Sequence, residues 1–412
     1  MALTFPQDWP ERAPMLEAFA AALDAVDPER AVQSALSADP FEGPVTVVAI
    51  GKAAAAMARG VPGPASGVVV SDHVEPIPDG FATYLGAHPV PDESSEAAGA
   101  AAAAVIDGSD GPILFLISGG ASALCELPVP GVTIIDVATV TASLLRSGAD
   151  ISEMNAVRKH LSQLKGGRLA ERARGLPART LVVSDVVGDR LDVIASGPTV
   201  GDPTTFGDAR EVLMRYRISP PQRVATALAK GDVGELSETP EKPIPGHEAF
   251  IVANGEIAAA AAVRSALSSG VPARVATTEL SGDAVAEVQQ LLGSANAPGM
   301  TFVAGETTVE VTGGGTGGRN QHAALAAAIE LAERDLGLIF GALATDGVDG
   351  PTDGAGAVVD AGTIVRGAAA GLDARHHLAD HDSHPFLEAS GDLLRIGPSG
   401  TNVGDLWVVW QQ

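Results

Sequence analysis

The stretch "PVTVVAIGKAAAAMARG" (residues 44–60) indicates the class of the fold. Its apolar run Val45–Ile50 has the length of a buried strand, and Gly51-Lys52 and an alanine-rich helical segment follow it at once. Comparable strand-like runs recur in the first half of the chain at residues 67–73, 113–117 and 180–189. Strands that alternate with helical segments predict βαβ units, and therefore a parallel sheet with helices on both faces.

A second α/β pattern follows a polar, proline-containing stretch at residues 232–249, which we interpret as a linker. The alternation restarts in the segments at residues 250–263, 273–280, 300–311 and 336–347. The strand-like segment at residues 392–410 could return to either domain. Because 412 residues are too many for one ordinary core, we predict two α/β domains, over residues 1–240 and 241–412, with a helical lead-in at residues 11–40.

The composition is that of a globular protein, with 46% hydrophobic and 19% charged residues. The formal net charge of −25 argues against a nucleic-acid partner, because phosphate backbones require a basic surface. The single cysteine, Cys125, excludes an internal disulfide, and neither a signal peptide nor a long apolar span occurs. We therefore expect a cytoplasmic protein that does not bind membranes.

Positive charge is scarce, and lysine is the scarcest source of it. The chain has only five lysines, and Lys52, Lys159 and Lys165 fall within the motifs described below. An anionic substrate would require these few cations to gather at one place. Lys52 ends a predicted strand and opens a helix, where its side chain could reach over a bound phosphate. The alternative is an ordinary exposed lysine.

Other polar clusters also follow predicted strands, where the ligands of open parallel sheets bind. The turn Ser118-Gly119-Gly120-Ala121-Ser122 could direct backbone N–H groups at an anion, or it could be a tight βα turn. Asp185 and Asp189 could hold Mg²⁺ on nucleotide phosphates, or they could cap turns. Ser196-Gly197 offers a second turn with hydroxyl and N–H donors, and Asp346 belongs to an aspartate-rich turn after another strand.

The segment "MNAVRKHLSQLKGGRLA" (residues 154–170) predicts a helix with a cationic stripe. At the angular spacing of an α-helix, Asn155, Arg158, Ser162 and Lys165 fall within an arc of roughly 80°. Arg158 and Lys165 would then face the same anion. The alternative is a solvated helix face.

In the second half of the chain, Gly313, Gly315 and Gly318 fit the dinucleotide fingerprint G-x-G-x-x-G. The preceding "TTVEV" alternates polar and apolar residues, as a half-exposed antiparallel strand does, rather than the buried first strand of a dinucleotide fold. Arg319 and Asn320 also stand at the helix start, where a pyrophosphate would require bare backbone. We therefore interpret the match as accidental.

Eight segments together resemble the glycerate 2-kinase family, whose carboxyl-terminal part is known as the MOFRL domain. They occur in the family's order over nearly the whole chain: "AIGKAAAAM" (49–57), "GAHPVPDESS" (86–95), "LISGGASAL" (116–124), "NAVRKHLSQLKGGRLA" (155–170), "SDVVGD…IASGPT" (184–199), "GETTVEV…GGRNQ" (305–321), "ATDGVDGPTDGAGA" (344–357) and "GTNVGDL" (400–406). The chain departs from the family pattern at Ala121, where a third glycine is usual, at Arg190, where an acidic residue is common, and in "GGGTGG", which lacks a lysine.

The resemblance implies a kinase that uses ATP and Mg²⁺ to phosphorylate D-glycerate at its 2-hydroxyl, giving 2-phosphoglycerate and ADP. It also implies a Rossmann-like amino-terminal domain, a smaller α/β carboxyl-terminal domain with a mixed sheet, and an active site in the cleft between them. The partners would be small molecules, and a homodimer is one alternative for the assembly. Because members of the family have long been labelled hydroxypyruvate reductases, an NAD(P)H-dependent reductase is the rival hypothesis, and a non-catalytic metabolite-binding protein is a third.

The residues and the resemblance lead to one mechanistic hypothesis, phosphoryl transfer, in which catalysis is mostly positioning and charge neutralisation. Lys52 would lie beside the transferred phosphoryl, and residues 118–122 would cradle an anionic group. Arg158, aided by Lys165, would hold the glycerate carboxylate or a phosphate. The predicted site residues are, for catalysis, Lys52, Arg158 and Asp189; for substrate or nucleotide binding, Ser118, Gly119, Gly120, Ser122, Asn155, Lys165, Ser196, Gly197, Glu306, Arg319, Asn320 and Asp346; and for the metal, Asp185 and Asp189.

Overall fold

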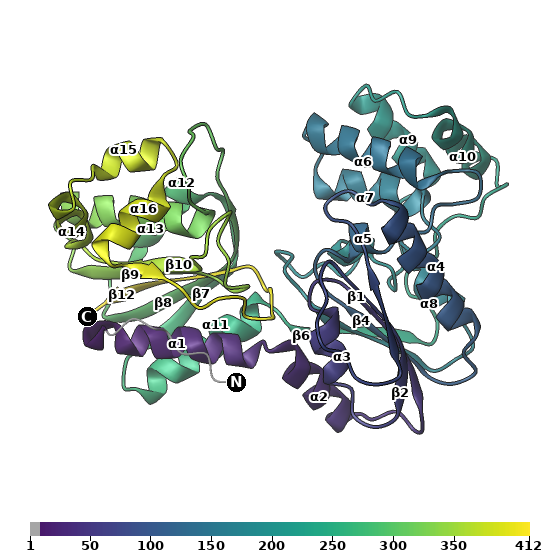
Figure 1. Cartoon of the computed structure of the whole chain (residues 1–412), viewed down its shortest axis with the longest axis horizontal. Helices are drawn as coiled ribbons and strands as arrows, with labels where there is room; N and C mark the ends of the chain where they lie inside the picture. Colours follow the sequence, from purple (N-terminus) through teal and green to yellow (C-terminus); the bar gives the residue numbers. More distant parts are fainter. Residues whose placement is uncertain (1–8) are drawn as a thin grey trace. The chain divides into compact units, whose positions relative to one another are not determined.

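The computed structural model describes residues 9–412, which form two compact units (Figure 1). One of them, the parallel-sheet unit, comprises residues 28–184 and 189–252. The other, the mixed-sheet unit, comprises the described residues up to Asp27 together with residues 185–188 and 253–412. Across residues 9–412, no helix combines the length and the apolar character that a membrane crossing needs.

The parallel-sheet unit is built on six strands in the doubly wound order of Rossmann-like folds. Across the sheet these are β3 (Phe81–Leu85), β2 (Ala65–Ser71), β1 (Val45–Ile50), β4 (Ile113–Ile117), β5 (Ala178–Val183) and β6 (His247–Ala253). β1 pairs in parallel with β2 and with β4, and the pairs β2–β3 and β4–β5 are parallel as well. The structure confirms the Rossmann-like fold that the sequence predicts.

Helices cover both faces of this sheet (Figure 1). α3 (Ala54–Arg59) follows β1 on one face, and α4 (Glu93–Asp107) lies on the other. The short helices α5 (Ala121–Leu124) and α8 (Arg168–Arg172) and the single turn η2 (Ile194–Ser196) belong to the loops that join later strands, while α2 (Pro28–Ala38) packs beside α3.

Four helices of this unit form a core of their own, which the sequence analysis did not anticipate. These are α6 (Ile134–Ser147), α7 (Ile151–His160), α9 (Phe206–Arg215) and α10 (Gln222–Asp232). Capping boxes start α6 at Thr133, α7 at Asp150 and α9 at Thr205. The cluster holds α7, and with it Arg158, in a defined orientation.

The mixed-sheet unit also has six strands, in the order β11 (Leu393–Leu394), β10 (Gly356–Val359), β9 (Leu338–Ala344), β12 (Asp405–Gln411), β8 (Gly299–Thr308) and β7 (Ala273–Asp283). β7 and β8 are parallel, and the other pairs are antiparallel. The predicted mixed sheet is therefore confirmed, and the last strand of the chain stays in this unit, between β8 and β9.

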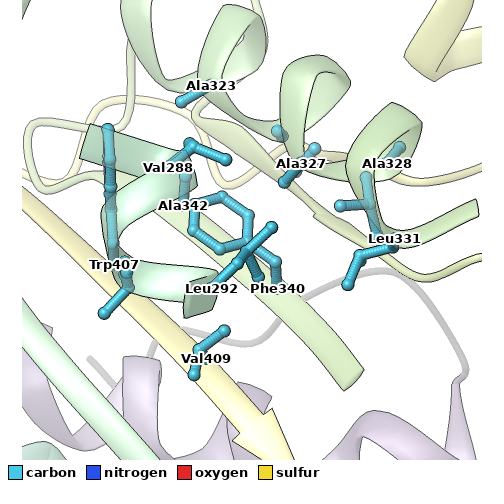
Figure 2. Packing of buried hydrophobic residues seen from close by; sticks show 14 of the residues in the cluster. Val288, Leu292, Ala323, Ala327, Ala328, Leu331, Phe340, Ala342, Trp407 and Val409 are labelled. Carbon is cyan, nitrogen blue, oxygen red and sulfur yellow. The ribbon is translucent and has the colours of Figure 1, made fainter. Parts of the chain in front are cut away.

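Helices also cover both faces of the mixed sheet (Figure 1). α12 (Ala284–Ser294) and α13 (Arg319–Glu333) pack on one face, where Phe340 and Trp407 meet edge to face at 5.6 Å between ring centroids (Figure 2). The remaining helices beside α13 are α14 (Thr363–Ala369), α15 (Ala374–Ala379) and α16 (Ser383–Ser390). The opposite face is covered by α11 (Gly255–Ser268) and α1 (Ala13–Ala25), the latter preceded by the turn η1 (Pro10–Arg12).

The division into units differs from the predicted boundary at residue 240 in two respects. β6 is the edge strand of the parallel sheet, and the predicted linker before it is packed, since Thr239 donates to Asp202 at 3.1 Å. The helix α1 belongs to the mixed-sheet unit, where the buried Arg12 donates to Asp392 at 2.8 Å. Neither long-range contact leaves a pattern in the local sequence.

Candidate active site

The loops that follow β1 and β4 are joined by hydrogen bonds. Lys52 donates its backbone N–H to the carbonyl of Gly119 at 2.9 Å, and Ser118 donates its own to Ile50 at 3.0 Å. The Ser118 hydroxyl accepts from the N–H of Ala53 at 3.0 Å. The backbone that carries Lys52 is therefore held in place by the neighbouring strand end. The Ser118 hydroxyl oxygen is already used as a hydrogen-bond acceptor between the two loops.

Gly51 makes this junction possible. Its φ of +128° is a conformation that side chains rarely adopt, and a Cβ there would lie 2.2 Å from the Ser118 hydroxyl oxygen. We predict that Gly51→Ala lowers the free energy of unfolding by about 3 kcal/mol or more, as measured by urea denaturation.

The matched control for this substitution is Gly63→Ala, which also has a positive φ, of +82°, but has no atom within 4 Å of the added Cβ. Its cost should be only the backbone strain, about 1 kcal/mol. Equal losses of stability in the two variants would contradict the close packing at Gly51.

Five residues form what we call the carboxyl-edge cluster: Lys52, Asp72, His88, Gly120 and Arg158. A Cβ on Gly120, whose φ is +82°, would lie 3.3 Å from Lys52 Cγ and 3.6 Å from His88 Cδ2. Burial lowers the pKa of His88, the charges of Lys52 and Arg158 lower it further, and Asp72 opposes them. Both predicted catalytic cations therefore act on the same imidazole.

Lys52 and Arg158 are unpaired cations. Lys52 is exposed and Arg158 half-buried, and neither side chain forms a hydrogen bond or an ion pair within residues 9–412. Burial lowers the pKa of the Arg158 guanidinium, and Glu126 only partly opposes this effect. A desolvated cation without a partner is costly, so this arrangement favours the binding of an anion.

Lys165, unlike Lys52 and Arg158, is not an unpaired cation. α7 ends at His160, so the predicted helical stripe from Asn155 to Lys165 is wrong. Both Lys165 and Glu126 are buried, and the Lys165 ammonium donates to the Glu126 carboxylate. The Lys165 ammonium has further N–H groups, but its burial beside Glu126 separates it from the open pair of cations, Lys52 and Arg158.

Three of the predicted binding residues bond to one another instead of presenting free donors. The Ser122 and Ser196 hydroxyls are 2.7 Å apart, Ser196 donates to Asn155 at 2.7 Å, and the Asn155 amide donates to the Val193 carbonyl at 3.2 Å. The backbone φ angle is positive at Ala195, Ser196 and Gly197. At the two non-glycine residues this conformation is strained, and it persists only where the surrounding structure enforces it. The network shapes the loop that carries residues 118–122.

The two predicted metal ligands lie in the turn after β5. Asp185 accepts a hydrogen bond from the Asn402 amide at 3.3 Å, and Asp189 has a φ of +52°. No group of three or more His, Cys, Asp or Glu side chains is arranged to hold a metal ion within the described part of the chain. One or two carboxylates, completed by water and phosphate oxygens, are however the ligands that Mg²⁺ usually takes on nucleotide phosphates, and Asp185 and Asp189 supply donors of that kind.

A cavity of about 450 Å³ opens in the mixed-sheet unit, beside the first turn of α13. Arg319 lines it, and its Nε and Nη2 donate to Asp405 at 2.7 and 3.1 Å, while Nη1 donates to Glu306 at 2.7 Å. Burial raises the pKa of Asp405 to about 6, although Arg319 acts against this shift. Asp346 lines the same cavity and accepts from the N–H of Val348.

Asn320, a predicted binding residue, is buried in a hydrogen-bond network instead. Its amide group donates to Asp349 at 3.2 Å and to Asp405 at 2.8 Å, and its oxygen accepts from Trp407 at 2.7 Å. Asn320 therefore positions the start of α13 and the carboxylate that holds Arg319.

The glycine loop does not offer a pyrophosphate cradle. The N–H groups of Gly314 and Thr316 donate to the carboxylates of Asp380 and Asp382. Those of Asn320 and Gln321 donate to Asp349, which therefore stands at the helix start where a pyrophosphate would bind. This supports the interpretation of the dinucleotide fingerprint as accidental.

Sequence reasoning missed His88, Asp72 and Asp405. His88 and Asp405 lie within the segments "GAHPVPDESS" and "GTNVGDL", which the analysis singled out without giving these residues a role. Asp72 follows β2, and its position after a strand was the available signal. Their partners are far away in the sequence, so no local pattern connects them.

Comparisons with known proteins agree with this organisation. A model described as "Domain of unknown function (DUF4147)" matches residues 14–229, and one described as "MOFRL family" matches residues 299–405. D-glycerate 2-kinase of Thermotoga maritima is 41% identical over 403 residues, which cover 93% of this chain and 94% of the relative. This chain belongs to the glycerate 2-kinase family.

Two further relatives extend the comparison. The crystal structure of glycerate kinase from Thermotoga maritima matches 98% of this chain and 100% of that one, with a TM-score of 0.89 and 38% identity. A relative from Agrobacterium vitis that carries a hydroxypyruvate reductase name is 40% identical over 410 residues, covering 94% of this chain and 92% of its own. The glycerate 2-kinase family therefore includes members with two different enzyme names.

Proposed function

We propose that this protein is an ATP-dependent glycerate 2-kinase, which transfers the γ-phosphoryl of ATP to the 2-hydroxyl of D-glycerate. The observation that carries the proposal is the pair of unpaired cations, Lys52 and Arg158, that act on one imidazole at the carboxyl edge of the parallel sheet. In a chain with a net charge of −25, such a site suits two anionic substrates. The kinase names of the similar proteins support the same assignment.

In this mechanism Lys52 neutralises charge on the transferred phosphoryl, because a compact ammonium on a fixed backbone stabilises the developing negative oxygens. Arg158 holds the glycerate carboxylate, which a guanidinium can bind through two parallel hydrogen bonds. His88, whose pKa is lowered by burial and by the two cations, is the member of the carboxyl-edge cluster that would accept the proton of the 2-hydroxyl. Proximity and orientation then supply most of the rate acceleration.

Asp185 and Asp189 would hold Mg²⁺ on the nucleotide phosphates, where the ion neutralises charge on the transferred group. Glu306, Arg319, Asn320 and Asp346 remain predicted contributors from the mixed-sheet unit. The expectations of one active site formed by both units, of a cytoplasmic location and of a homodimer remain predictions too.

The test of the proposed function is a phosphorus NMR spectrum of the product formed from ATP and D-glycerate. We expect an ester whose phosphorus couples to a single proton, since carbon 2 bears only one, together with ADP. Coupling to two protons would show transfer to the 3-hydroxyl and contradict the proposed regiochemistry. No ester above the level of an enzyme-free sample would contradict the kinase assignment.

The rival function, an NAD(P)H-dependent hydroxypyruvate reductase, rests on the Gly313–Gly318 fingerprint and on the reductase name that the Agrobacterium vitis relative carries. The hydrogen bonds of the glycine loop to Asp380, Asp382 and Asp349 argue against a dinucleotide there. Mixing the protein with hydroxypyruvate and NADH, and following nicotinamide absorbance, separates the two functions. We expect no loss of absorbance beyond that of the reagents alone.

A further inference from the structure

The cavity of the mixed-sheet unit has polar groups without partners in its walls. Of the nine buried side-chain N and O atoms that lack a hydrogen bond within residues 9–412, four belong to residues that line it: Thr307 Oγ1, His322 Nδ1, His381 Nδ1 and Ser383 Oγ. Thr307, His322 and Ser383 are 1%, 7% and 0% exposed. Each such group costs about 1–3 kcal/mol, so their concentration in one place indicates a bound partner.

Two of these residues form a stacked aromatic pair. The rings of His322 and His381 stack with their centroids 4.9 Å apart and their planes inclined by 21°. Burial lowers the pKa of His322 to about 4, His381 lowers it further and Asp283 opposes the shift, so this ring is uncharged at neutral pH. An uncharged imidazole pair suits stacking against a planar heteroaromatic ring.

The cavity also combines an anion-binding group with an acceptor for hydroxyl groups. The buried Asp405 orients Arg319, whose other partner, Glu306, is exposed and can be displaced. The guanidinium keeps N–H groups for an anion in addition to those it already uses. The Asp346 carboxylate can accept hydrogen bonds from a sugar, as acidic residues do in nucleotide sites.

The size of the cavity distinguishes between the two substrates. At about 450 Å³ it lies within the range of sites for cofactors and drug-sized ligands. A three-carbon acid would leave most of this volume, and the apolar side chains of Val309, Val311 and Pro351, without contacts. A nucleotide would use the aromatic, apolar and charged parts of the wall together.

We propose that this cavity binds the nucleotide substrate, with its base against His322 and His381, its sugar hydroxyls on Asp346 and its phosphates toward Arg319. The inference rests on the proposed kinase function. It divides the work between the units: the mixed-sheet unit binds the nucleotide, and the carboxyl-edge cluster binds glycerate and the transferred phosphoryl. Because Asp349 caps the start of α13, the phosphates bind through Arg319 rather than through the helix amides.

The test measures ADP binding to the full chain by titration calorimetry, in the wild type and in Thr307→Val, Ser383→Ala and His381→Asn variants. A hydroxyl that has no partner in the free protein can be removed without loss, so the melting temperature of the ligand-free Thr307→Val and Ser383→Ala proteins should stay unchanged or rise. Their Kd for ADP should increase about 5–10-fold. Thr301→Val, in the same strand but outside the cavity, is the matched control and should bind ADP as the wild type does.

His381→Asn tests the base separately, since asparagine tolerates the φ of +55° at this position. Its Kd for ADP should increase about 10-fold, while its Kd for tripolyphosphate, which has no base, should not change. Binding of ADP with wild-type affinity by all three variants would overturn the inference. So would a rise in the KM for glycerate without a rise in the Kd for ADP, because the cavity would then belong to the acid. Failure of the proposed function would be seen separately, as the absence of the phosphate ester with the wild-type protein.

Discussion

Replacing Lys52 with methionine should lower the turnover number by about 10²–10⁴-fold and leave the folded structure unchanged. The Lys52 side chain lies against the Gly120 loop, with its Cγ 3.3 Å from a Cβ placed on Gly120, and no side chain within residues 9–412 pairs with its ammonium. Its backbone N–H, not its side chain, makes the bond to Gly119 that joins the two loops. The substitution therefore removes the charge from the site and preserves the junction. Steady-state kinetics with ATP and D-glycerate, together with circular dichroism, measure both effects.

The control for this experiment is Lys230→Met. Lys230 is an exposed lysine of α10 whose ammonium is 4.0 Å from Glu235, and it should be replaced without loss of activity. A turnover number for Lys52→Met close to that of Lys230→Met would remove Lys52 from the mechanism.

Replacing Arg158 with methionine should lower kcat/KM for D-glycerate by roughly 10²-fold, because two charge-assisted hydrogen bonds to the carboxylate are lost. The same substitution should raise the free energy of unfolding of the ligand-free protein by about 1–2 kcal/mol. The reason is that the guanidinium is partly desolvated, which lowers its pKa, while no side chain within residues 9–412 pairs with it. Opposite effects on stability and activity are expected of a residue kept for binding.

The control for Arg158 is Arg223→Met, since Arg223 is an exposed arginine 3.9 Å from Asp136 and should change neither quantity by much. Urea denaturation gives the stability of each variant, and initial rates at varied glycerate give kcat/KM. If the Arg158 variant is less stable than the wild type and has full activity, the residue is structural and our assignment is wrong.

Both predictions depend on which cationic side chains lack a carboxylate partner. Most arginines of the described chain are committed to carboxylates, as Arg12 is to Asp392 and Arg319 is to Asp405. Lys159 and Lys165 are likewise held in buried pairs with Asp202 and Glu126. Lys52 and Arg158 belong to none of these pairs, and unlike the exposed, unpaired Arg217, Arg264 and Arg274 they act together on His88.

The sequence predicted most of the strands, although not β3 or β10, and the physical reason is local. A run such as Val45–Ile50 is buried on both faces of a parallel sheet, so it must be continuously apolar, and β1 has these bounds in the structure. The residue that follows such a strand stands at the carboxyl edge, and this placed Lys52 and Ser118 correctly at neighbouring strand ends. The sequence also placed Arg319 and Asn320 at the start of a helix, and α13 begins at Arg319.

The sequence alone could not predict which distant residues would bond to one another. The helical stripe that included Lys165 failed because α7 stops at His160, and only the fold brings Glu126 to the Lys165 ammonium. Asn320 and Asp405 are 85 residues apart, so their bond depends on the pairing of β12 beside β9 and on the packing of α13. The stacking of His322 on His381 likewise depends on the tertiary structure.

Apolar periodicity and strand-end position therefore determine the fold class and the edge of the sheet where chemistry takes place, because both follow from neighbouring residues and from which of them must be buried. Tertiary structure alone decides which charges are neutralised and which stay available, because each ion pair requires two distant segments to meet. The candidate site is defined by that second kind of information: Lys52 and Arg158 are available because no carboxylate of the described chain reaches them.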